Sequence, residues 1–195
     1  MLENILNTVG IDEAGRGCLF GPVVAAAVVL PDTFPDLTYQ QIKDSKKLSE
    51  KQRAHLETYI KTHAIAYAIG TVDATTIDQI NILNATLQAM HQALDQIPQS
   101  TYTKIYIDGT QFKPYHHIPY TCVPKGDNIY LPIAAASILA KCHRDRLITE
   151  GCLANPTWDR YALKNNKGYG TKAHLEALQT HGPIEGHRLT FARVS

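Results

Sequence analysis

Apolar residues occur along the chain in several short, nearly unbroken runs. The runs at 8–12 (TVGID) and 23–30 (VVAAAVVL) predict two strands joined by a glycine-rich turn, and the second is apolar enough to be buried on both faces. A third run at 64–72 (AIAYAIGTV) predicts a further strand. Two shorter strands are predicted at 104–109 (KIYIDG) and 120–127 (YTCVPKGD), and each has an acidic residue at or beside its end.

Hydrophobic residues spaced three and four positions apart predict helices between these strands. Residues 49–63 form one such segment, and Ser49 and Gln52 have the spacing of a capping box, in which each side chain satisfies a backbone donor of the other. A long helix is predicted from about residue 76 to Pro98, which ends it. The apolar stripe of this helix is expected to face the core. It consists of Ile80, Leu83, Leu87, Met90, Leu94 and Ile97.

The C-terminal third combines a helical pattern with a polar, loop-like tail. Residues 131–148 (LPIAAASILAKCHRDRLI) predict a helix whose small residues allow close packing on a sheet. The chain is polar from about residue 151 until a last helix, predicted over 171–182. This order of elements predicts an α/β fold with a mixed sheet flanked by helices and a small helical C-terminal segment. We therefore expect a main domain at 1–150 and a loop and helix segment at 151–195.

Length, composition and charge narrow the class of protein. The chain has 195 residues, of which 44% are hydrophobic, as expected for one folded domain with a small appendage. Its net charge of +1 does not by itself indicate a polyanionic partner, so any nucleic-acid surface must be local. No signal peptide or membrane-spanning run is evident. The four cysteines lack metal-type spacing, which indicates reduced thiols in a cytoplasmic protein.

Three acidic residues lie at the ends of predicted strands: Asp12, Asp108 and Asp127. Strand ends of one sheet can converge on one spot, where gathered carboxylates repel one another and are costly to desolvate. A divalent cation removes that cost, and oxygen ligands suit Mg²⁺ or Mn²⁺. Two such ions about 3.5–4 Å apart can catalyse phosphodiester hydrolysis. Each acid alone is equally compatible with an ordinary turn or a solvated face. The prediction of a metal site therefore rests on the three acids together.

Glu13 and the glycines that follow it bear on the same site. Neighbours on a regular strand point to opposite faces, so Asp12 and Glu13 can serve one site only if the strand ends or bulges there. Gly15 and Gly17 give the backbone freedom to turn away and let a ligand approach closely. Arg16 between them is placed to pair with a phosphate or to brace a carboxylate.

Several sequence blocks follow one another in a fixed order. They are GIDEAGRG with GPVVAAAVVL at 10–30, DSKKLSEKQR at 44–53, ID..NIL.AT..AM..A at 77–93, YIDG at 106–109, KGD at 125–127, AAASILAK..RDR at 134–146 and KGYGTKAHLEAL at 167–178. In order and spacing these blocks resemble the ribonuclease HII family, the bacterial type 2 ribonucleases H, over nearly the whole chain. The chain departs from the usual family pattern at Cys18 and Phe20 and in the segment 155–166.

The resemblance implies a ribonuclease H-like fold and a metal-dependent endonuclease. The expected substrates are the RNA strand of RNA–DNA hybrids and single ribonucleotides embedded in duplex DNA. One cation would activate water and the other would stabilise the leaving 3′-oxygen, which gives 5′-phosphate and 3′-hydroxyl ends. The residues that the resemblance assigns to catalysis and to Mg²⁺ or Mn²⁺ are Asp12, Glu13, Asp108 and Asp127.

The resemblance also implies residues that contact the substrate. Gly15, Arg16 and Gly17 match a loop that senses the ribose 2′-hydroxyl, the group that distinguishes RNA from DNA. Tyr169 matches a tyrosine that packs on the sugar next to the junction, and Lys46 resembles a phosphate-contacting lysine. The expected partners are therefore nucleic acids. No obligate protein partner, and no clear sequence for a sliding-clamp partner, is evident.

Two groups of basic residues are candidates for a duplex-binding surface, although each is equally compatible with a solvated face. One group comprises Lys43, Lys46, Lys47, Lys51 and Arg53. The other comprises Lys164, Lys167 and Lys172, beside Tyr161 and Tyr169.

Two further clusters of polar residues are interpreted as structural. His116 and His117 lack a third ligand at suitable spacing and are predicted to be surface loop residues rather than a metal site. Lys141, Arg144 and Asp145 lie on one predicted helix and are expected to form ion pairs.

Two alternative functions from other classes stay open. A different two-metal nuclease of the same fold, such as a structure-specific resolvase, would cleave an all-DNA substrate. A non-catalytic hybrid-binding protein would take up neither Mg²⁺ nor Mn²⁺, although the presence of all four acids argues against it.

Overall fold

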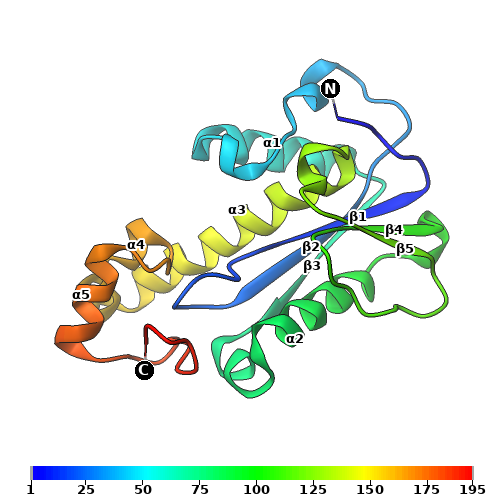
Figure 1. The fold of residues 1–195 in the computed structure, drawn as a ribbon. Coiled ribbons are helices and arrows are strands. Elements are labelled where there is room, and N and C mark those ends of the chain that lie inside the picture. The colour runs from blue at the N-terminus through cyan, green and yellow to red at the C-terminus, as the bar shows by residue number, and fades with distance from the viewer. Residues whose placement is uncertain (1, 195) are drawn as a thin grey trace.

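The computed structural model describes residues 2–194, and its centre is a five-stranded mixed sheet with helices on both faces (Figure 1). The sheet order is β3-β2-β1-β4-β5, in which β1 pairs antiparallel with β2 and parallel with β4. Strands β2 and β3 are antiparallel, and β4 and β5 are parallel. This arrangement confirms the predicted fold class. The strands are β1 (Thr8–Ala14), β2 (Val23–Val29), β3 (Ala66–Val72), β4 (Lys104–Asp108) and β5 (Tyr120–Val123).

The helices cover the two faces of the sheet unequally. Helices α1 (Glu50–His63) and α3 (Leu131–Ala154) lie on one face, and α2 (Ala74–Leu94) lies on the other (Figure 1). Side chains of a strand alternate between the faces, so Ile11 packs into the α2 core and Ala14 into the α1–α3 core. Both faces of the central strands are therefore buried, as their near-continuous apolar sequence predicts.

The predicted capping box at the start of α1 is confirmed. The Ser49 hydroxyl accepts from the Gln52 backbone, and the Gln52 side chain accepts from the Ser49 backbone. The long helix α2 begins at Ala74, slightly before the predicted start, because Asp73 caps it. Its helical geometry is interrupted at Asn81, whose φ is 65° and whose side chain accepts from the backbone of Asn84. The stripe packs on the sheet as predicted, although Ile97 lies beyond the helix end.

Strand β5 is shorter than predicted. It ends at Val123, so the prediction that Asp127 terminates a strand is wrong. Pairing ends at Val123 because its partner strand β4 ends at Asp108, and Lys125, which adopts a left-handed conformation with φ of 59°, then turns the chain away from an extended path. Asp127 lies in the short 3₁₀ turn Gly126–Asn128 that follows.

The segment predicted as a polar loop after residue 151 is largely helical. Helix α3 continues to Ala154 and is followed by a 3₁₀ helix at Pro156–Tyr161 and by α4 (Leu163–Asn166). The predicted last helix, α5 (Lys172–His181), is confirmed and is capped by Thr171. These elements enclose a third small core with the turn that follows β1. This core includes Leu19, Phe20, Ile148, Tyr161, Leu163 and Leu178.

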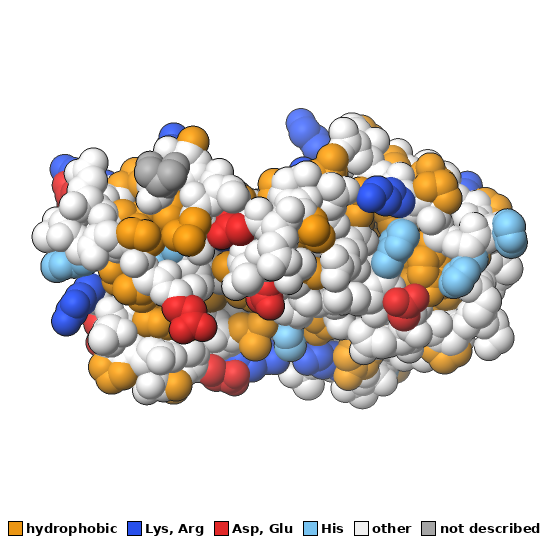
Figure 2. Space-filling model, turned by 90° about the horizontal axis from the view of Figure 1, so that it is seen from below, with side chains coloured by type: hydrophobic (Ala, Val, Ile, Leu, Met, Phe, Trp, Pro, Cys, Tyr) orange, Lys and Arg blue, Asp and Glu red, His pale blue; other side chains and the backbone are white. Residues whose placement is uncertain are grey.

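The surface mixes side chains of different kinds. On the face seen in Figure 2, acidic, basic and hydrophobic side chains are interspersed. Within residues 2–194, none of the helices is both long enough and apolar enough to cross a membrane.

Candidate active site

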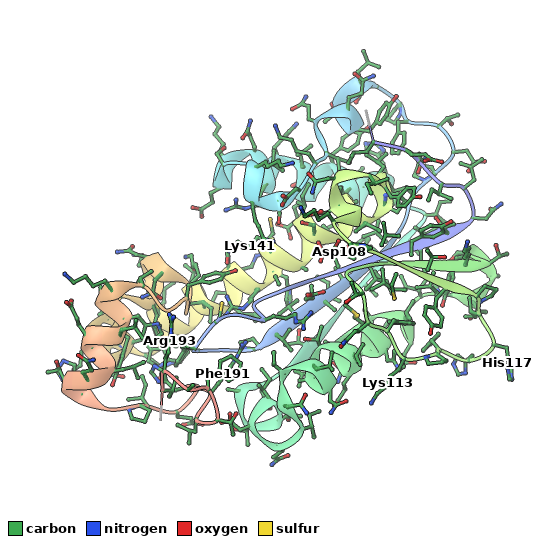
Figure 3. All side chains as sticks on the ribbon, in the orientation of Figure 1. Asp108, Lys113, His117, Lys141, Phe191 and Arg193 are labelled. Atoms are coloured by element: carbon green, nitrogen blue, oxygen red, sulfur yellow. The ribbon has the colours of Figure 1, made fainter. Side chains whose placement is uncertain are left out.

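The parallel pairing of β1 with β4 brings Asp12 and Asp108 together. Ile11 pairs with Ile107 in register, so the next residue of each strand is acidic. Because both isoleucines pack into the α2 core, Asp12 and Asp108 take the opposite face, beneath α3. Asp12 is buried, and Asp108 is half-buried. Figure 3 shows Asp108 at the centre of the molecule, between the sheet and the first turns of α3.

Asp127 reaches the same place from a turn rather than from a strand. The backbone N–H of Gly126 donates to Asp108 Oδ1 at 2.7 Å, which fixes the 126–128 turn against the end of β4. Asp127 is buried there, and its Oδ1 accepts from the Asn128 side chain at 2.7 Å. The structure therefore supports the predicted proximity of these acids, although the predicted element was wrong.

Glu13 joins the cluster although β1 neither ends nor bulges at Asp12, the two alternatives that the sequence left open. Strand β1 stays regular through this point, with Glu13 paired to Ala25 on β2. The neighbouring strand β4 ends at Asp108, and Gly109, with φ of 99°, turns the chain away. Glu13 and Asp108 consequently line one cavity of about 150 Å³ beyond the strand end. Among the described residues, the buried Glu13 Oε2 has no hydrogen-bond partner.

The pKa values of Asp12, Glu13 and Asp127 are raised by burial and by neighbouring carboxylates. Burial raises the pKa of Asp12 well above its ordinary value, and the negative charges of Glu13, Asp108 and Asp127 raise it further. Burial also raises the pKa of Glu13, against the opposing effect of Arg16, whose Nη1 lies 3.4 Å from Glu13 Oε1. The pKa of Asp127 is raised by burial and by nearby carboxylates that include Asp108. The cluster is thus short of positive charge.

These residues fit hard divalent cations. All four donors are carboxylate oxygens, which suit Mg²⁺ and Mn²⁺, and the orphaned Glu13 Oε2 lacks the partner that a cation would supply. Between residues 2 and 194, no three acidic, histidine or cysteine side chains are placed to hold a metal ion together. Side-chain movements would therefore accompany binding.

The contribution of Asp12 to the stability of the metal-free protein is expected to fall as pH rises. Because the pKa of Asp12 is raised in the folded chain, its stabilising contribution is present below the ordinary value of 3.8 and is lost as pH rises through the raised value. In EDTA, the melting temperature of the wild type should fall relative to that of Asp12→Asn as pH rises above 3.8, the ordinary pKa of this carboxyl group. Mg²⁺ or Mn²⁺ at pH 8 should stabilise the wild type more than the variant. A difference between the two proteins that does not change with pH would contradict this.

The residues predicted to contact substrate also converge. A cavity of about 210 Å³ is lined by Gly15, Arg16, Gly17, Lys46 and Tyr169, together with Glu13 of the acidic cluster. Gly15 has φ of 94°, and a Cβ there would lie 2.1 Å from Arg144 Nε, so this position requires glycine. A Cβ at Gly17 would face open space among the described residues. Tyr169 is 38% exposed, and Lys141 Nζ lies 5.3 Å from the centroid of its ring.

Sequence reasoning missed two buried arginines that hold the turn after β1. Arg144 donates to the carbonyl oxygens of Pro22, Phe20 and Lys167 at 2.8–2.9 Å. Arg188 donates from Nη1 to the Arg16 carbonyl and from Nε to the Gly21 carbonyl, both at 3.0 Å. Both side chains are fully buried. Their partners are backbone oxygens, which no residue pattern reveals.

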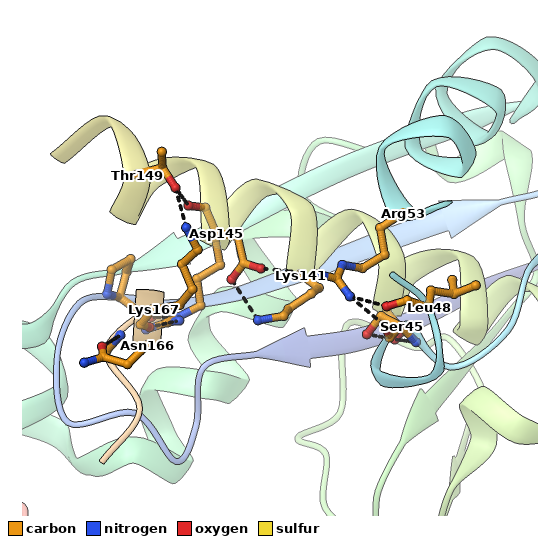
Figure 4. Close-up of polar contacts among 12 residues, drawn as sticks. Ser45, Leu48, Arg53, Lys141, Asp145, Thr149, Asn166 and Lys167 are labelled. Carbon is orange, nitrogen blue, oxygen red and sulfur yellow. Dashed lines mark hydrogen bonds and ion pairs between the residues drawn. The ribbon is translucent and has the colours of Figure 1, made fainter. Parts of the chain in front are cut away.

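The expected ion pairs on α3 form only in part. Lys141 Nζ pairs with Asp145 Oδ1 at 2.8 Å, as Figure 4 shows. Arg144 binds the three carbonyl oxygens instead, so the prediction that it forms an ion pair was wrong. Arg53 also turns inward, donating to the Leu48 carbonyl at 2.6 Å and lying 3.9 Å from Asp145. Arg53 therefore does not contribute its charge to the first group of basic residues that the sequence suggested as a duplex-binding surface.

The second basic group is also less available than predicted. Lys167 Nζ donates to Thr149 Oγ1 at 2.7 Å, as Figure 4 shows. Lys172 stays exposed and lies 3.7 Å from Glu176. His116 and His117 are exposed as predicted, and Figure 3 shows His117 at the opposite end of the molecule from α5.

The sheet order and the acidic cluster at the ends of β1 and β4 define a ribonuclease H-like protein. The family model described as Ribonuclease HII matches residues 9–195. The chain belongs to the ribonuclease HII family and is an endoribonuclease, a hydrolase that acts on RNA in RNA–DNA hybrids. Family membership decides against the two alternative functions, the resolvase and the non-catalytic binding protein.

Similar proteins cover nearly the whole chain. Ribonuclease HII of Parabacteroides distasonis is 50% identical over 93% of this chain and 88% of its own, and that of Bacteroides fragilis strain ATCC 25285 is 48% identical over 97% and 91%. The structure of ribonuclease H2 from Pyrococcus horikoshii OT3 matches with a TM-score of 0.76 and 25% identity, over 96% of this chain and 94% of that one. Bst-RNase HIII in complex with Mn²⁺ shares the fold, with a TM-score of 0.66 and 20% identity over 98% and 68%.

Proposed function

We propose that the chain cleaves both RNA–DNA hybrids and duplex DNA that carries single ribonucleotides, using two divalent cations held by Asp12, Glu13, Asp108 and Asp127. The observation that carries the proposal is the juxtaposition of two groups. Four carboxylates gather at one strand end, and Glu13 of that cluster also lines the cavity formed by the glycine-framed loop and Tyr169. A phosphodiester at this junction would meet the carboxylate cluster and the candidate ribose contacts together.

The chain's own groups supply orientation and charge. When bound, Mg²⁺ or Mn²⁺ ions supply positive charge that activates an attacking water and stabilises the leaving 3′-oxygen, giving 5′-phosphate and 3′-hydroxyl ends. Asp108 is held by the Gly126 N–H, and Asp12 Oδ1 accepts from the Glu13 N–H at 2.6 Å. These contacts orient both carboxylates before substrate arrives. Arg16 lies at the cavity edge, where it balances Glu13 and can meet a phosphate.

Recognition of a single ribonucleotide needs a contact to the 2′-hydroxyl. The backbone at Gly15 and Gly17 can supply it, because the space beside Gly17 is open and Gly15 lets the loop turn tightly over Arg144. Tyr169 presents its ring to the same cavity and is well placed to pack on a sugar. We include residues 151–195 in this proposal as the segment that completes the substrate surface, and we place the enzyme in the reducing cytoplasm, which suits its four free cysteines.

A mapped cleavage assay tests the proposed function. Three duplexes should be compared with Mg²⁺, with Mn²⁺ and with EDTA: one with a single ribonucleotide, one with an all-RNA strand, and one of DNA alone. We expect metal-dependent cuts with 5′-phosphate ends in the first two duplexes. Cleavage of the all-DNA duplex at a similar rate would refute ribose recognition, and cleavage in EDTA would refute the role of the cations.

Lys46 is expected to contribute one phosphate contact. Replacing Lys46 by alanine should weaken binding to all three duplexes and lower the slope of log affinity against log salt by about one. Lys51→Ala is the matched control, because Lys51 carries the same charge in the same basic group but does not line the cavity. Fluorescence anisotropy at several salt concentrations in Ca²⁺ measures both slopes. Equal slopes for the wild type and Lys46→Ala would contradict the assignment.

A further inference from the structure

Two histidines of the third core are buried against each other. His174 of α5 and His187 of the segment 184–188 are 0% and 3% exposed, and their Nε2 atoms lie 3.0 Å apart. The remaining nitrogen of each ring faces the backbone. His174 Nδ1 lies 3.0 Å from the Tyr169 carbonyl oxygen, and His187 Nδ1 lies 3.0 Å from the Ile184 nitrogen. The pair therefore links α5, the 184–188 segment and the Tyr169 turn.

Only one arrangement of protons satisfies all three contacts with neutral rings. The Tyr169 carbonyl can only accept, so His174 Nδ1 donates and its Nε2 must accept from His187 Nε2. His187 Nδ1 then accepts from the Ile184 N–H. The reverse arrangement, with His187 donating to the Ile184 carbonyl, would require a charged His174 ring. Burial opposes that charge, because it lowers the pKa of His174 and lowers that of His187 to about 4.

The same segment also holds the glycine-framed loop. Next to His187, Arg188 donates to the Arg16 carbonyl through its side chain and to the Leu19 carbonyl through its backbone. Phe20 forms a bridge with His187, and the Gly21 N–H donates to the Gly186 carbonyl at 2.8 Å. Two consecutive residues thus connect the two sides of the substrate cavity. His187 acts through His174 on the Tyr169 side, and Arg188 acts on the side of Arg16.

A purely structural role explains this pair poorly. Burying two imidazoles removes four polar nitrogens from water, whereas apolar side chains would fill the same space without that cost. The nitrogens direct the hydrogen-bond chain to the Tyr169 carbonyl, which also accepts from the Thr171 N–H at 2.8 Å. Ring contacts to Phe20 and Tyr161 hold His187 at centroid distances of 4.9 and 5.0 Å.

We infer that His174 and His187 are positioning residues for ribose recognition: their directed hydrogen-bond chain sets the Tyr169 turn relative to the loop that carries Arg16. The inference rests on the proposed function, because it assigns to Tyr169 a contact with the sugar. Neither histidine touches substrate in this arrangement. Their effect reaches the reaction only through the placement of Tyr169.

Two substitutions at one position separate positioning from packing. In His174→Asn the side-chain amide takes the place of Nδ1 and can still donate to the Tyr169 carbonyl, whereas in His174→Gln it takes the place of Nε2 and keeps only the contact to His187. Both variants lose the ring and one hydrogen bond, so similar melting temperatures are expected. On the single-ribonucleotide duplex, His174→Asn should keep kcat/KM within about threefold and His174→Gln should lose about tenfold or more, since small misplacements at reacting groups have large effects.

A double-mutant cycle with Tyr169→Ala tests the route of the effect. If His174 acts through Tyr169, His174→Gln should lower kcat/KM in the wild type and have little further effect in Tyr169→Ala. Equal losses in His174→Asn and His174→Gln, or a full loss that persists in Tyr169→Ala, would overturn the inference while leaving the proposed function intact. An active wild type with an equally active Tyr169→Ala would instead refute the substrate contact and the inference with it. A wild type that fails to cut the duplex would refute the proposed function itself.

Nitrogen NMR of the wild type tests the same chain without any substitution. Long-range correlation spectra distinguish the two neutral tautomers of a histidine ring. We expect His174 to carry its proton on Nδ1 and His187 on Nε2. The opposite tautomers, or rapid averaging between them, would overturn the inference even if both variants failed to fold.

Discussion

The Asp108→Asn variant should lose hydrolysis of the single-ribonucleotide duplex by about 10³-fold or more, because one charged ligand of the proposed cations is removed. Asparagine has nearly the same size, and its side-chain oxygen can still accept from the Gly126 N–H, so the turn that carries Asp127 should stay in place. The loss should therefore appear in kcat rather than in the fold. Single-turnover cleavage with saturating enzyme and Mg²⁺ measures it.

The same substitution should not destabilise the metal-free protein. Asp108 raises the pKa of Asp12 and of Asp127, so the three carboxylates repel one another. Removing one charge relieves that repulsion, and the melting temperature in EDTA should stay equal or rise. Asp32→Asn makes the same chemical change at an exposed site outside the cluster and should leave activity unchanged. Near wild-type cleavage by Asp108→Asn would remove Asp108 from the catalytic group.

Replacing Arg144 by methionine should have the largest effect on stability. The change removes three hydrogen bonds and leaves the carbonyl oxygens of Phe20, which is buried, and of Pro22 and Lys167, which are partly buried, without their donor. A buried polar group left unsatisfied costs about 1–3 kcal/mol. The free energy of unfolding should therefore fall by about 3 kcal/mol or more, which urea denaturation at constant pH measures.

Arg160→Met is the matched control for this prediction. Arg160 is exposed in the 3₁₀ helix Pro156–Tyr161, so its replacement should change the free energy of unfolding by less than about 0.5 kcal/mol. A small loss in Arg144→Met, comparable to that of the control, would show that the carbonyl oxygens find other donors. The buried arginine would then be dispensable for holding the turn after β1.

Most of the sheet could be predicted from sequence because its central strands are continuous apolar runs. The proximity of Asp12 and Asp108 was also predicted from sequence, because both acids lie at the ends of predicted strands. Only Asp108 ends its strand in the structure. Strand β1 continues past Asp12 to Ala14, so the prediction that Asp12 ends a strand is wrong, and parallel pairing with β4 brings the two acids together. Asp127 was assigned to the wrong element because nothing in its apolar pattern reveals that Lys125 adopts a left-handed conformation. The geometry that places Glu13 in the cluster could not be predicted from its own strand. It depends on where the neighbouring strand β4 ends.

The residues that support the site were beyond sequence reasoning for a different reason. Arg144 and Arg188 donate to backbone carbonyl oxygens far away in the chain, so no side-chain pattern identifies their partners. The departures from the family pattern also gain meaning only in three dimensions. Phe20 and Trp158 both belong to these departures, and their rings pack edge to face with centroids 4.7 Å apart. The two departures from the family pattern, Phe20 and the segment that carries Trp158, therefore pack against each other.

The turn after β1 has a consequence for biosynthesis. Its donors, Arg144 and Arg188, lie 122 and 172 residues beyond the Pro22 and Arg16 carbonyls that they bind. They therefore leave the ribosome roughly 6 to 35 s after the turn itself at ordinary elongation rates. During that interval the nascent chain carries Asp12 and Glu13 but lacks the arginines that shape the loop beside them. The capacity to discriminate ribose from deoxyribose should thus arise late in translation, after the sheet has begun to form.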